Sequence, residues 1–141
     1  MIFIFLSSIG VHGNSSMGYQ INESSPICPE NTYALSKYLG EQVAFHWQKV
    51  YGTSVTSVRI FNAYGPRVRT TGAYGAVFGV FFKQKLEKKP FTIVGDGNQK
   101  RDFLYVTDVC DAFYKAALNK SGFEIFNLGF GKSKSVNYLA S

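Results

Sequence analysis

The sequence predicts an α/β fold in which helices cover a largely parallel sheet. Residues 2–7 form a continuous apolar run, which is typical of a strand covered on both faces. Stretches with strand and helix patterns then alternate along the chain, as they do in α/β proteins. The 141 residues are 45% hydrophobic and 16% aromatic, which is enough for a core, and the charged fraction of 17% argues against a disordered chain.

A long helix is expected from about Thr32 to Tyr51. Asn31 or Thr32 can cap its first turn, and Gly52 can end it. Its apolar residues lie on more than one side, which suits a helix that packs on a sheet and on a second surface. Before the helix, residues 10–29 are rich in Gly, Ser, Asn and Pro and predict a loop.

The remaining elements are shorter. A β-branched strand is expected at residues 54–61. After it we expect, in order, a helix at 77–87, strands at 91–94 and 103–106, a helix at 108–118 capped by Thr107, and a strand at 124–128.

Tyr33, Lys37 and Ser8 form a constellation suited to acid–base chemistry on an alcohol. Residues four apart lie one above the other on a helix, so the ammonium of Lys37 is expected one turn from the phenol of Tyr33. A nearby cation favours the ionised phenol, which can take a proton from a hydroxyl or return it to a carbonyl oxygen. Ser8 follows the first strand and can hold the same oxygen by a hydrogen bond.

Four segments of the chain carry a family resemblance. They are residues 5–13 (FLSSIGVHG), 29–41 (PENTYALSKYLGE), 59–67 (RIFNAYGPR) and 95–108 (GDGNQKRDFLYVTD). In this order they resemble the extended short-chain dehydrogenase/reductase family, and within it the NAD-dependent nucleotide-sugar epimerases and dehydratases, with UDP-glucose 4-epimerase-like enzymes nearest.

The resemblance implies a partial Rossmann-like fold with part of the small substrate-binding domain. Residues 1–66 would form the C-terminal part of the dinucleotide-binding fold and carry the catalytic residues. Residues 67–141 would form part of the nucleotide-sugar-binding region, interleaved with the last sheet strand. The family's glycine-rich turn and its acidic ribose ligand have no counterpart here, so we expect a fragment that lacks about four strands and whose isolated chain is inactive.

The resemblance also assigns roles to individual residues. It implies Ser8, Tyr33 and Lys37 as catalytic residues, Tyr33, Lys37 and Phe61 as NAD contacts, and Ser8, Asn62, Val77, Val94 and Arg101 as contacts of the sugar nucleotide, with no metal.

Some of these roles have plainer alternatives. Asn62 can simply open a turn, and core packing explains Val77 and Val94 equally well. Arg101 suits a diphosphate clamp because a guanidinium matches two phosphate oxygens, but it can also pair with a neighbouring aspartate, Asp102 or Asp96.

The chain differs from the family pattern at two places near Ser8, and the first difference limits the type of reaction. Family dehydratases carry an Asp-Glu pair directly after the catalytic hydroxyl residue, whereas Ile9 and Gly10 follow Ser8. The resemblance therefore implies an epimerase or a simple ketoreductase. His12 replaces the tyrosine usual in this block, and His46 is expected to be a packing or surface residue.

The formal net charge of +6 suggests an anionic partner, and a diphosphate sugar such as a UDP-sugar qualifies. No nucleic-acid reader motif is recognisable, and no run reaches membrane-spanning length. Cys28 and Cys110 lack metal spacing, so reduced thiols in a cytoplasmic protein are expected.

The first strand would be left as an apolar sheet edge, so we expect a homodimer or higher oligomer. Three interpretations remain open: a truncated epimerase, a cofactor-free nucleotide-sugar-binding or interaction module, and one half of a split enzyme.

Overall fold

The computed structural model describes residues 1–13, 20–70, 77–119 and 122–141. Two compact units make up the chain. The first unit comprises Met1–Phe61 and Thr107–Leu128, and the second comprises Asn62–Val106 and Gly129–Ser141. The chain therefore leaves the first unit after Phe61 and returns to it at Thr107.

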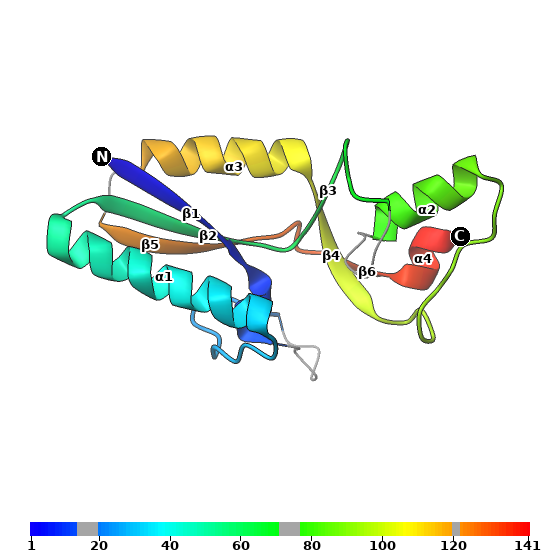
Figure 1. Cartoon of the computed structure of the whole chain (residues 1–141), viewed down its shortest axis with the longest axis horizontal. Helices are drawn as coiled ribbons and strands as arrows, with labels where there is room; N and C mark the ends of the chain where they lie inside the picture. Colours follow the sequence, from blue (N-terminus) through cyan, green and yellow to red (C-terminus); the bar gives the residue numbers. More distant parts are fainter. Residues whose placement is uncertain (14–19, 71–76, 120–121) are drawn as a thin grey trace. The chain divides into compact units, whose positions relative to one another are not determined.

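A parallel three-stranded sheet forms the centre of the first unit (Figure 1). Its strands are β1 (Ile2–Ser8), β2 (Ser54–Ile60) and β5 (Phe123–Leu128), in the order β1-β2-β5. The middle strand β2 is buried without interruption from Val55 to Arg59. This arrangement confirms the predicted α/β class and the strands expected near residues 2–7, 54–61 and 124–128.

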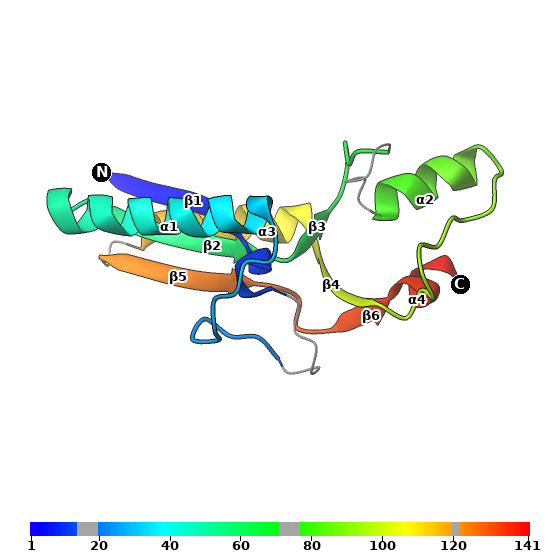
Figure 2. The same cartoon turned by 60° about the horizontal axis from the view of Figure 1, so that its bottom comes forward.

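Helices α1 (Thr32–Tyr51) and α3 (Val106–Leu118) lie on opposite faces of this sheet (Figures 1 and 2). The bounds of α1 are as predicted. The Asn31 side chain accepts a hydrogen bond of 2.9 Å from the Ala34 N–H, and Gly52 ends the helix in the left-handed conformation with φ 65°. The prediction that Thr107 caps α3 is wrong, because the helix already begins at Val106 and takes Thr107 into its first turn.

Strand β1 lies at an edge of the sheet. Within the described parts of the chain it pairs with β2 alone, as expected for a strand without a second neighbour. Ile2, Phe3 and Leu6 remain exposed, so the expectation that this apolar run is covered on both faces is not met here.

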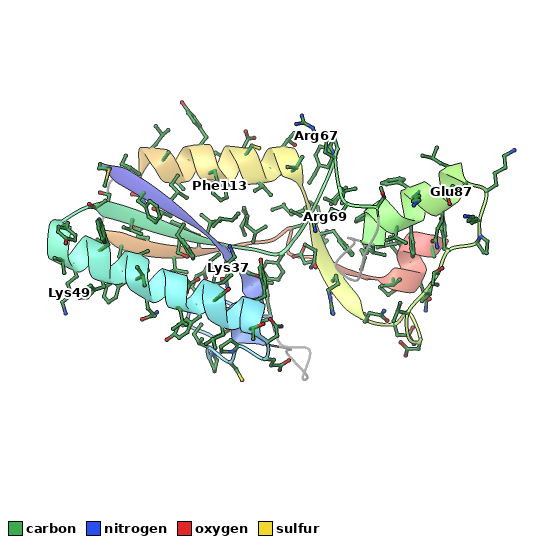
Figure 3. All side chains as sticks on the ribbon, viewed as in Figure 1. Lys37, Lys49, Arg67, Arg69, Glu87 and Phe113 are labelled. Carbon is green, nitrogen blue, oxygen red and sulfur yellow. The ribbon has the colours of Figure 1, made fainter. Side chains whose placement is uncertain are left out.

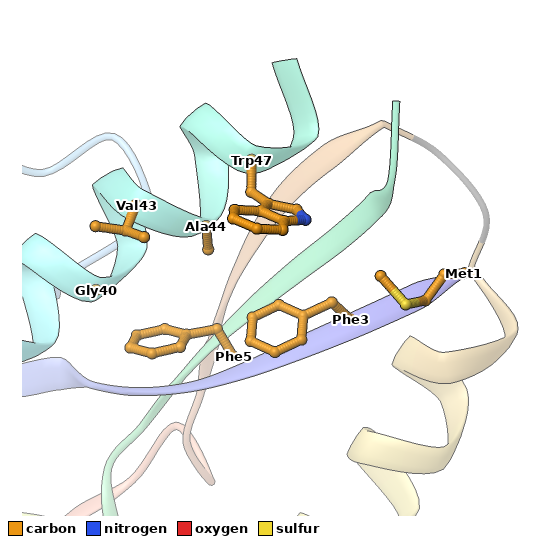
Figure 4. A pocket seen from close by; sticks show the side chains of 7 residues that line it. All are labelled: Met1, Phe3, Phe5, Gly40, Val43, Ala44 and Trp47. Atoms are coloured by element: carbon orange, nitrogen blue, oxygen red, sulfur yellow. The ribbon is translucent and has the colours of Figure 1, made fainter. Parts of the chain in front are cut away.

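An apolar cavity of about 450 Å³ opens between β1 and α1 (Figure 4). Its lining residues are Met1, Phe3, Phe5, Gly40, Val43, Ala44 and Trp47. A site that binds a charged sugar nucleotide needs several polar groups, whereas this lining is almost entirely apolar and carries no charged side chain. The cavity therefore belongs to the uncovered edge rather than to a polar binding site.

The second unit holds a smaller, mixed sheet with the order β3-β4-β6. Strand β3 (Asn62–Tyr64) is parallel to β4 (Lys100–Tyr105), and β6 (Ser133–Ser135) is antiparallel to β4. Helices α2 (Val77–Leu86) and α4 (Val136–Ala140) complete the unit. Its core is aromatic: the Phe78 ring lies 4.4 Å from that of Tyr64 and 5.0 Å from that of Phe103, measured between ring centroids.

Several expected elements differ from those observed. No strand forms at 91–94, because the Thr92 N–H donates to the side chain of Gln84 on α2 rather than to a neighbouring strand. The strand expected at 103–106 begins earlier, at Lys100, where pairing with β6 extends it. Four elements were not predicted: β3, β6, α4 and a 3₁₀ turn η1 (Ile9–His12). The turn η1 extends into the loop expected at residues 10–29, of which residues 14–19 lie outside the described chain.

Within the described residues, no helix is both long enough and apolar enough to cross a membrane. In the same parts of the chain, no group of three or more His, Cys, Asp or Glu side chains is arranged to hold a metal ion.

Candidate active site

Tyr33 and Lys37 meet on the first turns of α1, as their spacing predicts. The Nζ atom of Lys37 lies 5.8 Å from the centroid of the Tyr33 ring. Tyr33 is 58% exposed, so a substrate can reach its hydroxyl. The helix thus places a cation beside an accessible phenol.

Lys37 is also tied to the strand that leads to Ser8. Its Nζ donates a hydrogen bond of 2.9 Å to the main-chain carbonyl of Leu6, and it lies 5.7 Å from the centroid of the Phe5 ring. Figure 3 shows the Lys37 side chain between α1 and the sheet. An ammonium group has three N–H donors, so the bond to Leu6 leaves two for a ligand.

Ser8 is the last residue of β1 and the N-cap of η1. Its Oγ accepts a hydrogen bond of 3.1 Å from the Gly10 N–H. Because this bond uses a lone pair of the oxygen, the Ser8 O–H remains free to donate to a ligand oxygen. The preceding serine, Ser7, is buried at 3% exposure, whereas Ser8 is only partly buried, which favours Ser8 as the accessible hydroxyl.

A buried ion pair lies one helical turn beyond Lys37, and sequence reasoning missed it. Glu41 is fully buried and Arg59 is 2% exposed. Arg59 donates from Nε to Oε1 of Glu41 at 2.8 Å and from Nη2 to Oε2 at 2.7 Å, and Ser57 Oγ donates to Oε1 at 3.2 Å. Burial works to raise the pKa of Glu41, but the hydrogen bonds from Arg59 and from neighbouring serine hydroxyls, together with the charge of Arg59, outweigh it and hold the pKa below its ordinary value.

His12 extends this ion pair toward the turn after Ser8. Its Nε2 lies 3.1 Å from Nη1 of Arg59, and its Nδ1 lies 2.9 Å from the carbonyl oxygen of Pro26. A guanidinium only donates, so Nε2 is the acceptor and Nδ1–H donates to Pro26. The imidazole is therefore directed into the protein, whereas His46 is exposed on α1. Two signals pointed to this cluster: an arginine inside a strand with buried neighbours, and a glutamate four residues after Lys37.

Apart from Ser8, the residues expected to bind the sugar nucleotide lie in the second unit. Asn62 begins β3, and its Nδ2 donates to the main-chain carbonyl of Asp102 at 2.9 Å. Val77 begins α2 and is partly buried. Val94 is 79% exposed, which rules out core packing as the reason for a valine there.

Arg101 is exposed, and its Nη1 donates to the main-chain carbonyl of Lys100 at 2.9 Å. The alternative pairing with a neighbouring aspartate is not seen among the described ion pairs. The carboxylate of Asp102 instead accepts from the N–H groups of Phe130 and Gly131, and that of Asp96 accepts from Asn98. The side chain of Arg101 therefore extends into solvent with donors available to a ligand.

The residues of the first unit fit one end of a nicotinamide cofactor. Within the described parts of the chain two N–H groups of Lys37 have no hydrogen-bond partner, and the phenol of Tyr33 is exposed. Phe61 directly follows β2 at the carboxyl end of the sheet, where ligands bind in open α/β folds. Phe61 is fixed there by a hydrogen bond of 3.0 Å from its N–H to the carbonyl of Leu128. A phosphate-binding glycine turn, needed at the other end of such a cofactor, is not found in this sequence.

Comparison with known proteins identifies the family. Residues 2–129 match the model of the NAD dependent epimerase/dehydratase family. The UDP-glucose 4-epimerase of Mycolicibacterium smegmatis is 32% identical over 136 residues, which is 96% of this chain and 43% of that protein.

Two solved structures superpose closely on the chain. The UDP-glucose 4-epimerase of Thermotoga maritima with UDP-glucose and the UDP-N-acetylglucosamine 4-epimerase of Methanobrevibacter ruminantium with UDP-N-acetylmuramic acid each give a TM-score of 0.90 at 33% identity. Each match covers 98% of this chain and 44% of the other, so the chain spans less than half the length of these proteins. The chain belongs to the NAD-dependent epimerase/dehydratase family.

Proposed function

We propose that this chain supplies the catalytic residues of a site that epimerises a UDP-sugar at C4 through a 4-keto intermediate, with NAD as cofactor. The observation that carries the proposal is the position of Lys37. Its ammonium lies beside the phenol of Tyr33 and is bonded to the strand that ends in Ser8.

Tyr33 is the proposed base. In the proposed reaction Tyr33 takes the proton of the C4 hydroxyl, with the ammonium of Lys37 beside its ring. The O–H of Ser8 donates a hydrogen bond to the same oxygen while it becomes a carbonyl. A bound NAD would supply the hydride acceptor and donor for the oxidation and reduction at C4. Tyr33 then gives the proton back, so the sugar is inverted at C4 without net oxidation.

Lys37 and Phe61 are the proposed contacts of the nicotinamide end of the cofactor. Lys37 would use its two uncommitted N–H groups for the ribose hydroxyls, and Phe61 would lie beside the ring. In this proposal the ammonium group of Lys37 would lie between the cofactor and Tyr33.

The second unit is proposed to hold the nucleotide diphosphate. Arg101 on β4 offers a guanidinium fork that suits two phosphate oxygens, and Asn62 offers a side-chain amide at the start of β3, the strand that pairs with β4. Val77 and Val94 would border the base. The net charge of +6 favours an anionic substrate of this kind.

Epimerisation is preferred over 4,6-dehydration because η1 carries no acid. Residues 9–12 are Ile, Gly, Val and His, and His12 is held by Arg59 and Pro26. Removal of a C6 hydroxyl needs a proton donor that this turn does not provide.

The open edge of β1 supports a proposal about assembly. An apolar parallel strand with one neighbour invites pairing, so we propose that the active protein covers this edge, as a homodimer or by pairing with a separately encoded half. A reducing, cytoplasmic location is proposed alongside it, which the two free, exposed cysteines Cys28 and Cys110 support.

Titration calorimetry with NAD and with UDP-glucose, followed by a 4-epimerase assay, tests the function. We expect UDP-glucose to bind and the Arg101→Met variant to bind it at least tenfold more weakly, because the variant lacks the cation. An exposed lysine, Lys85, changed to Met in the same way provides the control. Equal binding by wild type and Arg101→Met would contradict the proposed diphosphate site, and NAD-independent binding would favour a cofactor-free binding module.

A further inference from the structure

We propose that Glu41, Arg59 and His12, here called the buried triad, act as a positioning device that holds the turn after Ser8 in register with the α1 face that carries Lys37. The catalytic consequence rests on the proposed function, whereas the structural part can be measured without it. None of the three residues is proposed to touch substrate or cofactor.

The helix end of the buried triad fixes the rotation of α1. Tyr33, Lys37 and Glu41 follow one another at intervals of four and therefore lie along one stripe of the helix. Two charge-assisted bonds, at 2.7 and 2.8 Å, join Glu41 to Arg59 on the central strand. A bidentate pair accepts one geometry only, so a rotation of α1 that moved Tyr33 and Lys37 would also break it.

The other end of the buried triad fixes the turn that follows β1. Ser8 caps η1 at one end, and His12 closes it at the other with its bond of 3.1 Å to Arg59. The Nδ1–H of His12 also holds the carbonyl of Pro26 at 2.9 Å. The position of the Ser8 hydroxyl is thereby linked, through residues 9–12 and Arg59, to the same glutamate that fixes the helix.

Apolar packing alone would not fix the position of the turn after Ser8 relative to α1. The cluster buries a charged pair, and well-packed apolar side chains often match or exceed such a pair in stability. Directional bonds instead select one arrangement of three elements: η1, α1 and β2. Because Nε2 must accept from Arg59 and Nδ1–H must donate to Pro26, the arrangement also requires one tautomer of His12.

Nuclear magnetic resonance of the full chain tests the first requirement. The ring ¹⁵N signals of His12 are expected to show hydrogen on Nδ1 and an unprotonated acceptor at Nε2 at neutral pH. A wild-type spectrum with hydrogen on Nε2 would overturn the proposal, and this measurement needs no variant to fold.

Amide hydrogen exchange of paired variants tests the positioning itself. The Gly10 amide is bonded to Ser8 Oγ and the Gly13 amide to the Gly10 carbonyl, so both report on the turn. His12→Phe keeps a flat ring but loses both bonds, and we expect these two amides to exchange at least about tenfold faster, because the loss of a single buried hydrogen bond already has roughly that effect. The amide of Val58, inside β2, is expected to keep its rate.

His12→Gln retains a neutral donor and acceptor and is expected to restore most of the protection. His46→Phe, the same change at an exposed histidine of α1, is the control and should alter neither reporter amide. Unchanged exchange at Gly10 and Gly13 in His12→Phe would overturn the proposal. So would equal acceleration of Val58, which would mean that His12 only stabilises the whole unit.

Measuring the epimerase activity of the same variants tests whether the buried triad affects catalysis. If the protein epimerises UDP-glucose, His12→Phe should lower kcat about tenfold with KM unchanged, and His12→Gln should recover it. An equal kcat in wild type and His12→Phe would overturn the catalytic consequence. Absence of epimerase activity in the wild type would count against the proposed function alone, because the exchange result decides the structural part independently.

Discussion

The ammonium of Lys37 donates to the carbonyl of Leu6 over 2.9 Å, joining a helix residue to a strand residue that precedes it by 31 positions. Parallel strands cannot be joined by a tight turn, so β1 and β2 are connected through α1, and the helix needs a fixed contact with the strand it follows. The same ammonium lies 5.8 Å from the Tyr33 ring. One side chain therefore both anchors the helix and sets the electrostatic surroundings of the phenol.

The Lys37→Met variant tests this double role. We expect it to lose the proposed epimerase activity and to reduce the free energy of unfolding by about 1 kcal/mol, because a partly exposed, charge-assisted hydrogen bond is lost while the aliphatic stem is kept. Lys49→Met, at an exposed lysine of the same helix, is the control. Thermal and urea unfolding measure stability; an unchanged midpoint would show that the bond to Leu6 contributes nothing.

Tyr33→Phe is expected to separate chemistry from stability. The hydroxyl belongs to a side chain that is 58% exposed, so its removal should change the unfolding free energy by less than about 0.5 kcal/mol. The proposed epimerase activity should fall at least a hundredfold, as for loss of a general base. Tyr51→Phe, near the end of the same helix, should leave the rate unchanged; a Tyr33→Phe variant with full activity would remove Tyr33 from the mechanism.

The elements that sequence reasoning located correctly are those with local signals. The long helix is marked by Asn31 at its start and Gly52 at its end, and both caps are made within a few residues. The short strands β3 and β6 lack such signals, because their pairing with β4 joins segments far apart in the chain.

The buried triad shows why part of a site stays hidden from the sequence. In the sequence Glu41 looks like an ordinary helix-surface residue. Its partner Arg59 follows 18 positions later and comes to lie opposite it only when the sheet forms. In the sequence His12 looks only like a replacement for the tyrosine usual at this position. Its contact with the guanidinium of Arg59 becomes visible only in the fold. Conversely, residues 91–94 have a composition typical of a strand, but the Thr92 N–H donates to the side chain of Gln84 and is not available to a neighbouring strand.

Glu41→Gln is expected to be strongly destabilising. The change leaves the guanidinium of Arg59 buried without a countercharge, and breaking such a pair typically costs about 3–5 kcal/mol. Glu87→Gln breaks exposed pairs with Lys83 and Lys89 and should have no measurable effect. Urea unfolding distinguishes the two; a Glu41→Gln variant as stable as wild type would mean that Arg59 finds another partner.

Because the pKa of Glu41 is lowered in the folded protein, the free energy of unfolding is expected to depend on pH in the acid range. Its pKa in the folded protein lies below the unfolded value, so its stabilising contribution is complete above the unfolded pKa and is lost as the pH falls through the folded one. Glu23, whose pKa is lowered by the hydrogen bond from the Asn127 N–H, works in the same direction. Unfolding measured from neutral pH down through the carboxylate range should show stability falling on acidification, and the gap between wild type and Glu41→Gln should narrow. A gap that stays constant would mean that Glu41 keeps its charge throughout that range.

The uncovered edge of β1 predicts self-association. The strand contains no lysine, proline or bulge that would block pairing, and Phe3 and Leu6 are exposed. Phe3 also lines the apolar cavity that includes Val43 (Figure 4). We expect light scattering after size exclusion to show a dimer or larger species. Leu6→Lys should shift it toward the monomer, because a charge on an edge strand disfavours pairing, whereas Leu86→Lys, at an exposed leucine of the second unit, should not. A wild-type chain that stays monomeric with a cooperative melt would show that the edge is tolerated in water and that association plays no part in the fold.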